Sequence, residues 1–253
     1  MNFLRDTGLI FWSQLRMQLR NPVWVMIGLS QPVLYLVLFG PLVKSIAPTL
    51  GPGTDPWKVL TPALVIQIGL FGSMFAGFVM VSELRAGVIE RQRVTPASRS
   101  ALLVGRVLKD MVVLIVQALV LVAVAVVAFS LRPNIIGLIA SVLLIAVMAA
   151  GLASGSYALA LWARSEDTLA SVLNSLSVPI MLLSGILLPM SLAPHWLRII
   201  ADINPFQHTV EAARAMFRGD FGASEVYLGT GLTVAVSLAL IVVGARSFAR
   251  ENA

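Results

Sequence analysis

The segment 111–131, MVVLIVQALVLVAVAVVAFSL, contains fourteen Val, Leu, Ile or Phe residues and no charged residue. At about 1.5 Å per residue, a helix of this length crosses the ~30 Å hydrocarbon core of a bilayer. The aliphatic side chains favour insertion by roughly 4–8 kcal/mol, which exceeds the cost of burying the single Gln117. The segment therefore predicts a transmembrane helix and indicates an all-α integral membrane protein.

The rest of the chain has the same character. Of its 253 residues, 58% are hydrophobic and 12% are charged, and the mean hydropathy is +0.91. A soluble domain is closer to one quarter charged, so the bilayer is the expected solvent. Six segments are long and apolar enough to span it: 23–43, 60–82, 111–131, 135–163, 169–190 and 226–245.

The basic residues indicate the orientation of these spans. With both termini in the cytoplasm, the inner segments hold twelve of the eighteen Lys and Arg residues and the outer segments hold six. An excess of positive charge marks the cytoplasmic side. The net charge of +6 is confined to short segments between apolar runs, which is typical of topology signals and argues against nucleic-acid binding.

The first 22 residues have a different pattern from the spans. Apolar residues at Leu4, Phe11, Trp12, Leu15 and Leu19 fall on one helical face, and Arg5, Arg16 and Arg20 fall on the opposite face. This pattern predicts an amphipathic helix within residues 1–22 that lies at the inner surface of the membrane.

Residues 191–225 predict two short helices before the last span. Pro194 favours the start of the first helix, Asn204-Pro205 separates the two, and Gly219 suits the end of the second. The second helix is too short to cross a bilayer, and charges in mid-bilayer are costly. We expect both helices to be re-entrant or interfacial at the outer face. The charged residues of the second share the face opposite its apolar residues: Glu211, Arg214 and Arg218.

Several kinds of chemistry are excluded by what the sequence lacks. It has no G-x-x-x-x-G-K-[ST] phosphate loop, no H-E-x-x-H motif and no Cys, so we expect no ATP hydrolysis, no metal site and no catalytic residue in this chain. No Asp, Glu, Lys, Arg or His lies inside a predicted span. Ion-coupled carriers usually need such residues, and their absence argues against that class.

The polar and small residues of the spans leave two readings open. The polar side chains either bond between helices or line a path for an amphipathic substrate, and the candidates for that path are Gln31, Tyr35, Gln67, Asn174 and Ser177. Gly151 and Gly155 form a small-xxx-small pair, which permits close helix packing.

Two irregular regions carry ordered motifs. The segment 83–110 begins with an acidic residue and a glycine, which are followed by four dipeptides in a fixed order. These residues are Glu83, Gly87, Glu90–Arg91, Thr95–Pro96, Ser98–Arg99 and Gly105–Arg106. The later region has Ser184–Gly185–Ile186, Pro189, Pro194, Trp196–Leu197, Asn204–Pro205 and Arg214 to Gly219. In this order and spacing the sequence resembles the ABC-2 type permease family, the membrane subunits of type V ABC exporters, and within it the daunorubicin-type drug-resistance branch.

The resemblance covers nearly the whole chain and implies a single ABC-2 transmembrane domain over residues 1–253. It implies a permease subunit that exports amphipathic or hydrophobic compounds, such as drugs or lipids, across a bacterial plasma membrane. A second permease subunit, identical or paralogous, would pair with it. Two copies of a separate ATPase subunit would bind ATP and Mg²⁺, and no cofactor would bind to this chain.

In such exporters the first cytoplasmic loop, here 83–110, contacts the ATPase through a coupling helix. The residues that the resemblance assigns to this contact are Glu90, Arg91, Arg93, Thr95, Pro96, Ser98 and Arg99. A second contact falls on Arg164, Glu166 and Asp167. The competing reading of the basic loop is an anchor at anionic lipid. For the whole chain, the competing functions are a non-transporting scaffold for a cytoplasmic partner and, less favoured, an ion-coupled carrier.

Overall fold

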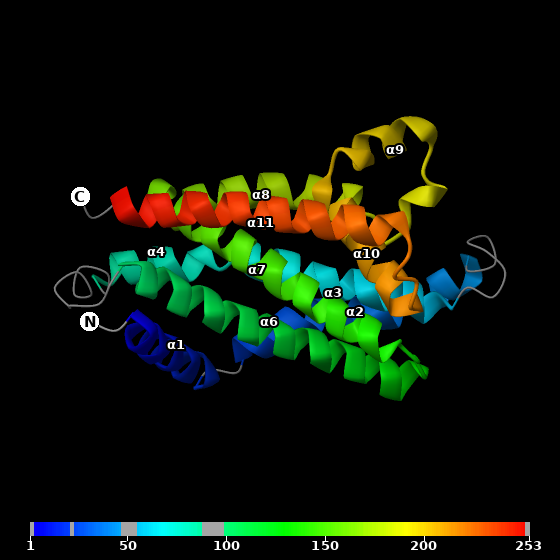
Figure 1. Cartoon of the computed structure of the whole chain (residues 1–253), viewed down its shortest axis with the longest axis horizontal. Helices are drawn as coiled ribbons and strands as arrows, with labels where there is room; N and C mark the ends of the chain where they lie inside the picture. Colours follow the sequence, from blue (N-terminus) through cyan, green and yellow to red (C-terminus); the bar gives the residue numbers. More distant parts are fainter. Residues whose placement is uncertain (1–2, 21–22, 47–54, 88–98, 251–253) are drawn as a thin grey trace.

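The computed structural model describes residues 3–20, 23–46, 55–87 and 99–250. Over these residues the chain is helical and contains no strand. Figure 1 shows the long helices running lengthwise in one bundle, with both ends of the described chain at the same end of that bundle. We call this the terminal end, and the other the distal end.

Within the described residues, five helical stretches are long and apolar enough to cross a membrane. They correspond to the first four predicted spans and the sixth, and they confirm a multi-pass, all-helical membrane protein. The helices are α2 (Val23–Ile46), the broken pair α3 (Pro56–Met74) and α4 (Gly77–Arg85), α6 (Arg99–Phe129), α7 (Ile135–Ala163) and α11 (Ser224–Arg250).

The predicted fifth span, 169–190, is placed wrongly at its C-terminal end. The corresponding helix, α8 (Glu166–Leu183), is 18 residues long and is not among the five stretches. Its first turn carries Glu166 and Asp167, and Ser165 caps it. The helix ends before Gly185, which has a φ of 70°, a conformation that favours Gly. Residues 184–189 therefore form a turn instead of the last two turns of a span.

The centre of the bundle is α3, which packs against α2, α6, α7 and α10. Its side chains from Val59 to Leu70 are buried throughout. The predicted small-residue pair lies where α7 packs on α11. A Cβ atom on Gly151 would lie 2.4 Å from the Cα of Ser237, and one on Gly155 would lie 3.0 Å from Leu240. The two backbones are thus too close at Gly151 for any larger residue.

Part of the predicted first cytoplasmic segment, 83–110, is helical. Residues 83–85 belong to α4, and α6 begins at Arg99 rather than near residue 111. With 31 residues, α6 is about 46 Å long, more than a bilayer core requires. Its first turns pack on α1 (Phe3–Leu19). Gly105 permits this approach, because a Cβ atom there would lie 2.8 Å from Ile10.

The face of α1 that packs on α6 is partly polar. Thr7 and Gln14 are buried, whereas Leu4, Trp12 and Leu19 are exposed, as are Arg5 and Arg16. The amphipathic pattern of the sequence thus predicts which side chains lie on the outward surface of α1. It does not indicate that polar side chains of α1 contact α6.

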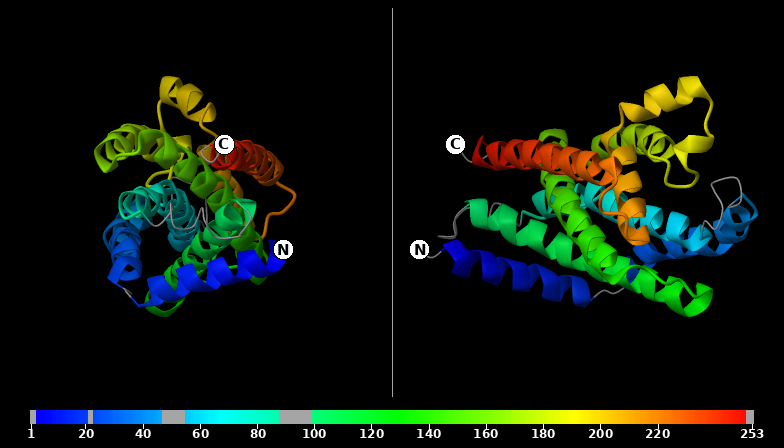
Figure 2. Two further views of the ribbon diagram at one scale, coloured as in Figure 1. Left: turned by 90° about the vertical axis from the view of Figure 1, so that its left-hand side faces the viewer. Right: turned by 45° about the vertical axis from the view of Figure 1, so that its right-hand side comes forward.

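The two short helices differ in their surroundings. After a single turn, η2 (Met190–Leu192), the chain forms α9 (His195–Asp202) and α10 (Pro205–Arg218). Both views in Figure 2 show α9 standing out from the bundle, and its Trp196, Ile199 and Ile203 are exposed. By contrast, α10 packs against α3, α7 and α11.

Candidate functional site

Charged residues gather inside the terminal end of the bundle. We call this group the polar cluster, and its members come from α1, α4, α6 and α7: Gln14, Gln18, Glu83, Arg106, Lys109, Asp110 and Tyr157. Its two acids and two bases balance in charge. Buried charges are tolerated only when they are paired, so the contacts within the cluster decide whether this end of the bundle is stable.

The pair between Arg106 and Glu83 joins α6 to α4. One guanidinium nitrogen of Arg106 lies 2.5 Å from the Glu83 carboxylate, and the two side chains are 3% and 10% exposed. Gln14 of α1 donates a hydrogen bond of 3.2 Å to the other carboxylate oxygen of Glu83. Arg106 also donates to the Met80 sulfur at 2.9 Å. One carboxylate at the end of α4 therefore holds both α1 and α6.

A second pair extends the cluster to α7. Asp110 forms an ion pair with Lys109 and accepts a hydrogen bond from the hydroxyl of Tyr157. The Lys109 ammonium donates to Gln18 of α1 at 3.2 Å. The cluster thus connects α1, α4, α6 and α7, and its helices α4 and α6 flank the connection 86–98.

The predicted second contact with the ATPase, residues 164–167, lies beside the end of α4. Arg164 has a φ of 52° and ends α7, and Glu166 and Asp167 occupy the first turn of α8. Glu166 pairs with Arg85 at 3.5 Å, and the side chains are 45% and 54% exposed. An exposed pair of this kind contributes only about 0–1 kcal/mol. The structure therefore brings residues 164–167 next to the start of the connection without fixing them tightly.

Most of the predicted coupling residues lie outside the described residues: Glu90, Arg91, Arg93, Thr95, Pro96 and Ser98. Arg99 is the first residue of α6. Their role in coupling stays a prediction.

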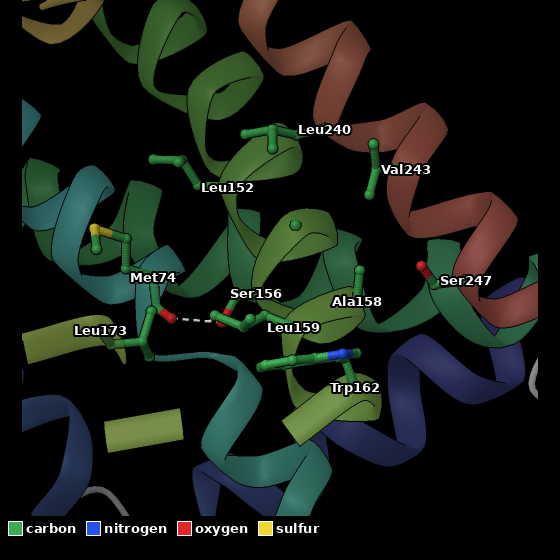
Figure 3. Close-up of a pocket in the computed structure, with 11 residues that line it drawn as sticks. Met74, Leu152, Ser156, Ala158, Leu159, Trp162, Leu173, Leu240, Val243 and Ser247 are labelled. Carbon is green, nitrogen blue, oxygen red and sulfur yellow. Dashed lines mark hydrogen bonds between the residues drawn. The ribbon is translucent and has the colours of Figure 1, made fainter. Parts of the chain in front are cut away.

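The second span is broken between α3 and α4, and Ser156 of α7 bridges the break. Its hydroxyl accepts a hydrogen bond of 2.9 Å from the backbone N–H of Gly77 and donates one to the carbonyl of Met74; Figure 3 shows the second bond as a dashed line. Helix ends leave such backbone groups without partners in their own helix. A Cβ on Gly77 would lie 2.6 Å from the Ser156 carbonyl, so the contact also needs the small residue.

Replacing Ser156 with alanine should lower the free energy of unfolding by about 1–3 kcal/mol, because two buried backbone groups lose their partner. The matched control is Ser154→Ala. Ser154 is also buried on α7, but its hydroxyl bonds only to the Ala150 carbonyl of its own helix. Reversible denaturation in mixed SDS micelles measures both. Equal losses in the two variants would show that the bridge across the break contributes nothing special.

The predicted substrate-path residues do not meet at one site within this chain. Gln31 donates to Tyr35 at 3.1 Å on the exposed side of α2, and Asn174 is exposed on α8. Ser177 is buried and donates to the Asn174 carbonyl of its own helix. Gln67 is buried in α3, and within the described residues neither atom of its amide has a hydrogen-bond partner.

The buried Arg214 corrects the prediction for the second short helix. Its side chain is 2% exposed and does not share an outward polar face with Arg218, which is exposed. Its guanidinium donates to the carbonyls of Val59 at 3.0 Å and Gly185 at 2.7 Å, and to the Glu211 carboxylate at 2.8 Å. These three acceptors satisfy a charge that would otherwise face apolar surroundings.

Arg214 keeps its charge in this position. Burial lowers the pKa of Arg214, and the neighbouring Glu211 carboxylate raises it. Arginine does not lose its proton in proteins, so the guanidinium remains a fixed charge. It ties α3, the turn after α8 and α10 together at the distal half of the bundle.

Among the residues that the structure describes, no group of three or more His, Asp and Glu side chains is placed to hold a metal ion. The polar groups are used to join helices.

Sequence reasoning identified the segment 83–110 but missed the polar cluster. It treated Arg106 and Lys109 as topology signals, and it placed Glu83 and Asp110 just outside the second and third spans. One signal was available: Arg106 and Asp110 are four residues apart and so lie on one helical face. That spacing, beside the buried Leu103 and Val107, indicates a helix that continues below the span.

Comparisons with known proteins agree with this architecture. The family model described as ABC-2 type transporter matches residues 5–217. A putative transport permease, ycf38, from Cyanophora paradoxa is 25% identical over 200 residues, which cover 78% of this chain and 69% of the relative. The daunorubicin resistance ABC transporter permease protein DrrB1 from Streptomyces coeruleorubidus is 23% identical over 238 residues, covering 92% of this chain and 82% of that one.

Proposed function

The chain belongs to the ABC-2 type transporter family, and we propose that it is the permease subunit of an ATP-binding cassette exporter. It moves an amphipathic or hydrophobic compound, such as a drug or a lipid, outward across the membrane. The observation that carries this proposal is the polar cluster, because it links the connection 86–98 to four helices of the bundle. A permease that is driven by a separate ATPase needs such a link.

The proposed topology has six spans, with α8 as the fifth and both termini in the cytoplasm. The pair between Arg85 and Glu166 supports it, because it puts the end of the second span and the start of α8 at the terminal end. The 18 residues of α8 reach about 27 Å, close to the thickness of a bilayer core. In this arrangement residues 1–253 are one transmembrane domain, α1 lies at the inner surface and residues 191–225 lie at the outer side.

The proposed partners follow from surfaces that this chain leaves open. Gln31 on α2 and Asn174 on α8 are polar and exposed. Polar groups that face hydrocarbon are costly, so these faces suit a second permease subunit or a substrate path between two subunits. Two copies of an ATPase subunit bind ATP and Mg²⁺ at the terminal end, and the chain itself binds no cofactor.

A scaffold that recruits a cytoplasmic partner without transport is the alternative. It explains the basic loop, but it gives no reason for buried bonds that connect the loop to the spans. An ion-coupled carrier needs a titratable group along its path. The charged residues of the polar cluster are paired with one another at the terminal end, which disfavours that class. We place the exporter in a bacterial plasma membrane.

The test is reconstitution of the full chain with an ATPase subunit that co-purifies with it. Vesicles should show ATP hydrolysis that rises with a transported amphipathic dye or drug, together with ATP-dependent flux of that compound. ATP hydrolysis by the permease chain alone, flux that follows an ion gradient without ATP, or a stable complex that supports no flux would each overturn the proposal in favour of another class.

Reversal of Arg91, Arg93 and Arg99 to glutamate should uncouple ATP hydrolysis from transport. The variant should still insert, because it leaves the apolar spans unchanged, but its loop would repel the carboxylates that Arg residues bind on a partner. A matched control reverses Arg246, which lies near the end of α11 and is exposed. Normal flux in the triple variant would remove the loop from the coupling mechanism.

A further inference from the structure

An apolar groove of about 420 Å³ opens between α7, α8 and α11. Leu152 and Leu159 of α7 form one wall, Leu173 of α8 lies opposite, and Leu240 of α11 closes the side, as Figure 3 shows. Met74 lies at its inner end, directly at the break between α3 and α4. None of the proposed coupling or path residues lines it, but Ser156, which bridges this break, does.

The two ends of the groove differ in polarity. The indole of Trp162, which is 72% exposed, and the hydroxyl of Ser247 lie at the end nearest the last residues of α7 and α11. Tryptophan gathers where hydrocarbon meets the polar region of a membrane. The groove is therefore apolar along its length and polar at the end that lies at the membrane boundary. This arrangement matches a molecule with a hydrocarbon chain and a polar head group.

The groove also opens onto the membrane-facing surface. Val243 on its rim continues the exposed apolar side of α11 that includes Leu238 and Val242. This surface meets hydrocarbon, so acyl chains are the molecules present at the opening. A single acyl chain fits the groove, since the volume lies within the usual range of ligand pockets, about 300–1,000 Å³.

We propose that this groove binds one acyl chain of a bilayer phospholipid from the leaflet at the terminal end. The chain would lie against Met74 and so support the break that Ser156 bridges. Lipid occupancy would then stiffen the second span just before the connection 86–98. This inference requires only that the protein is in a membrane, so its test does not depend on transport.

The experiment uses the full chain in nanodiscs that contain a phosphatidylglycerol with a diazirine in the middle of one acyl chain. After illumination, peptide mapping should place crosslinks on groove residues of α7 and α11. Labelling there should saturate as the probe fraction rises, whereas labelling of the remaining surface should rise in proportion to it. Proportional labelling at the groove would overturn the proposal.

Two variants of α11 localise the effect. Val243→Trp fills the groove and should abolish its crosslinks. Val242→Trp adds the same ring at a neighbouring residue of similar exposure, 45% against 49%, that does not line the groove, and should retain them. Should Val243→Trp not fold, Ala158→Leu fills the groove from α7. Retained crosslinks in the filled variant, or their loss in Val242→Trp, would contradict the assignment.

Two further outcomes identify other occupants. Crosslinks between two copies of the chain at groove residues would assign the surface to dimer contact. Loss of lipid labelling on addition of daunorubicin, at a constant lipid fraction, would assign the groove to transported cargo. Either result rejects the phospholipid and leaves the proposed exporter function intact.

Discussion

Replacing Arg106 with alanine is expected to lower the free energy of unfolding by about 3–5 kcal/mol, the largest effect that we expect from one substitution at the terminal end. The change leaves the Glu83 carboxylate buried, with Gln14 as its remaining hydrogen-bond donor among the contacts described. It also separates α6 from α4 on the two sides of the connection 86–98. Denaturation in mixed SDS micelles measures the loss, and ATP-dependent flux should fall with it.

Two controls distinguish the effect of breaking the buried ion pair from the effect of removing any positive charge. Arg85→Ala removes an exposed partner of Glu166 and should cost less than about 1 kcal/mol. The double variant Glu83→Gln with Arg106→Met removes both buried charges and should be far less destabilised than Arg106→Ala alone, because no unpaired charge remains. If the double variant were as unstable as the single one, the bond between the two charges would not explain the effect.

Replacing Arg214 with methionine should lower the free energy of unfolding by a similar amount, about 3–5 kcal/mol. Three hydrogen bonds from a charged donor disappear, each worth about 1.5–3 kcal/mol, and methionine regains part of the packing. Glu211 loses a partner but is 30% exposed, which limits the penalty on its side. The variant should also free the turn at Gly185, so faster proteolysis or hydrogen exchange is expected at residues 184–189.

Arg218→Met is the matched control, since Arg218 lies one turn further along α10 and is exposed. It should change stability by less than about 0.5 kcal/mol. Arg214→Lys keeps the charge but lacks the planar fork that reaches several acceptors at once, and should be intermediate. Equal stability of the methionine and lysine variants would show that charge and hydrogen bonds at this position contribute little.

The existence of the long helices followed from the sequence, because long apolar runs predicted α6, α7 and α11. The separation of the two short helices at Asn204–Pro205 also followed, and Asn204 caps α10. The end of α8 was misplaced, because residues 184–189 are nearly as apolar as the helix before them. Gly185 and Pro189 are the sequence signals of the turn there, and Gly185 adopts a positive φ.

The polar contacts could not be predicted in the same way. Composition gives the number of charges near a span, but a partner such as Glu83 for Arg106 depends on how distant segments pack. Arg214 was predicted to lie with Glu211 and Arg218 on the face of α10 opposite its apolar residues, because these residues are three and four positions apart. Two of its acceptors are the backbone carbonyls of Val59 and Gly185, which are distant in the sequence. Every residue has a backbone carbonyl, so no side-chain pattern identifies these two as partners.

The length of α6 has a mechanical consequence. It is held near one end by the polar cluster and at the other by Phe129, which stacks on Trp57 with ring centroids 4.2 Å apart. From the cluster, about 13 Å of helix extend to Arg99 and about 31 Å extend to Phe129. α6 therefore connects the polar cluster to the distal end of the bundle in one continuous helix. In the proposed exporter, a displacement imposed at Arg99 would be carried along this helix as far as Phe129.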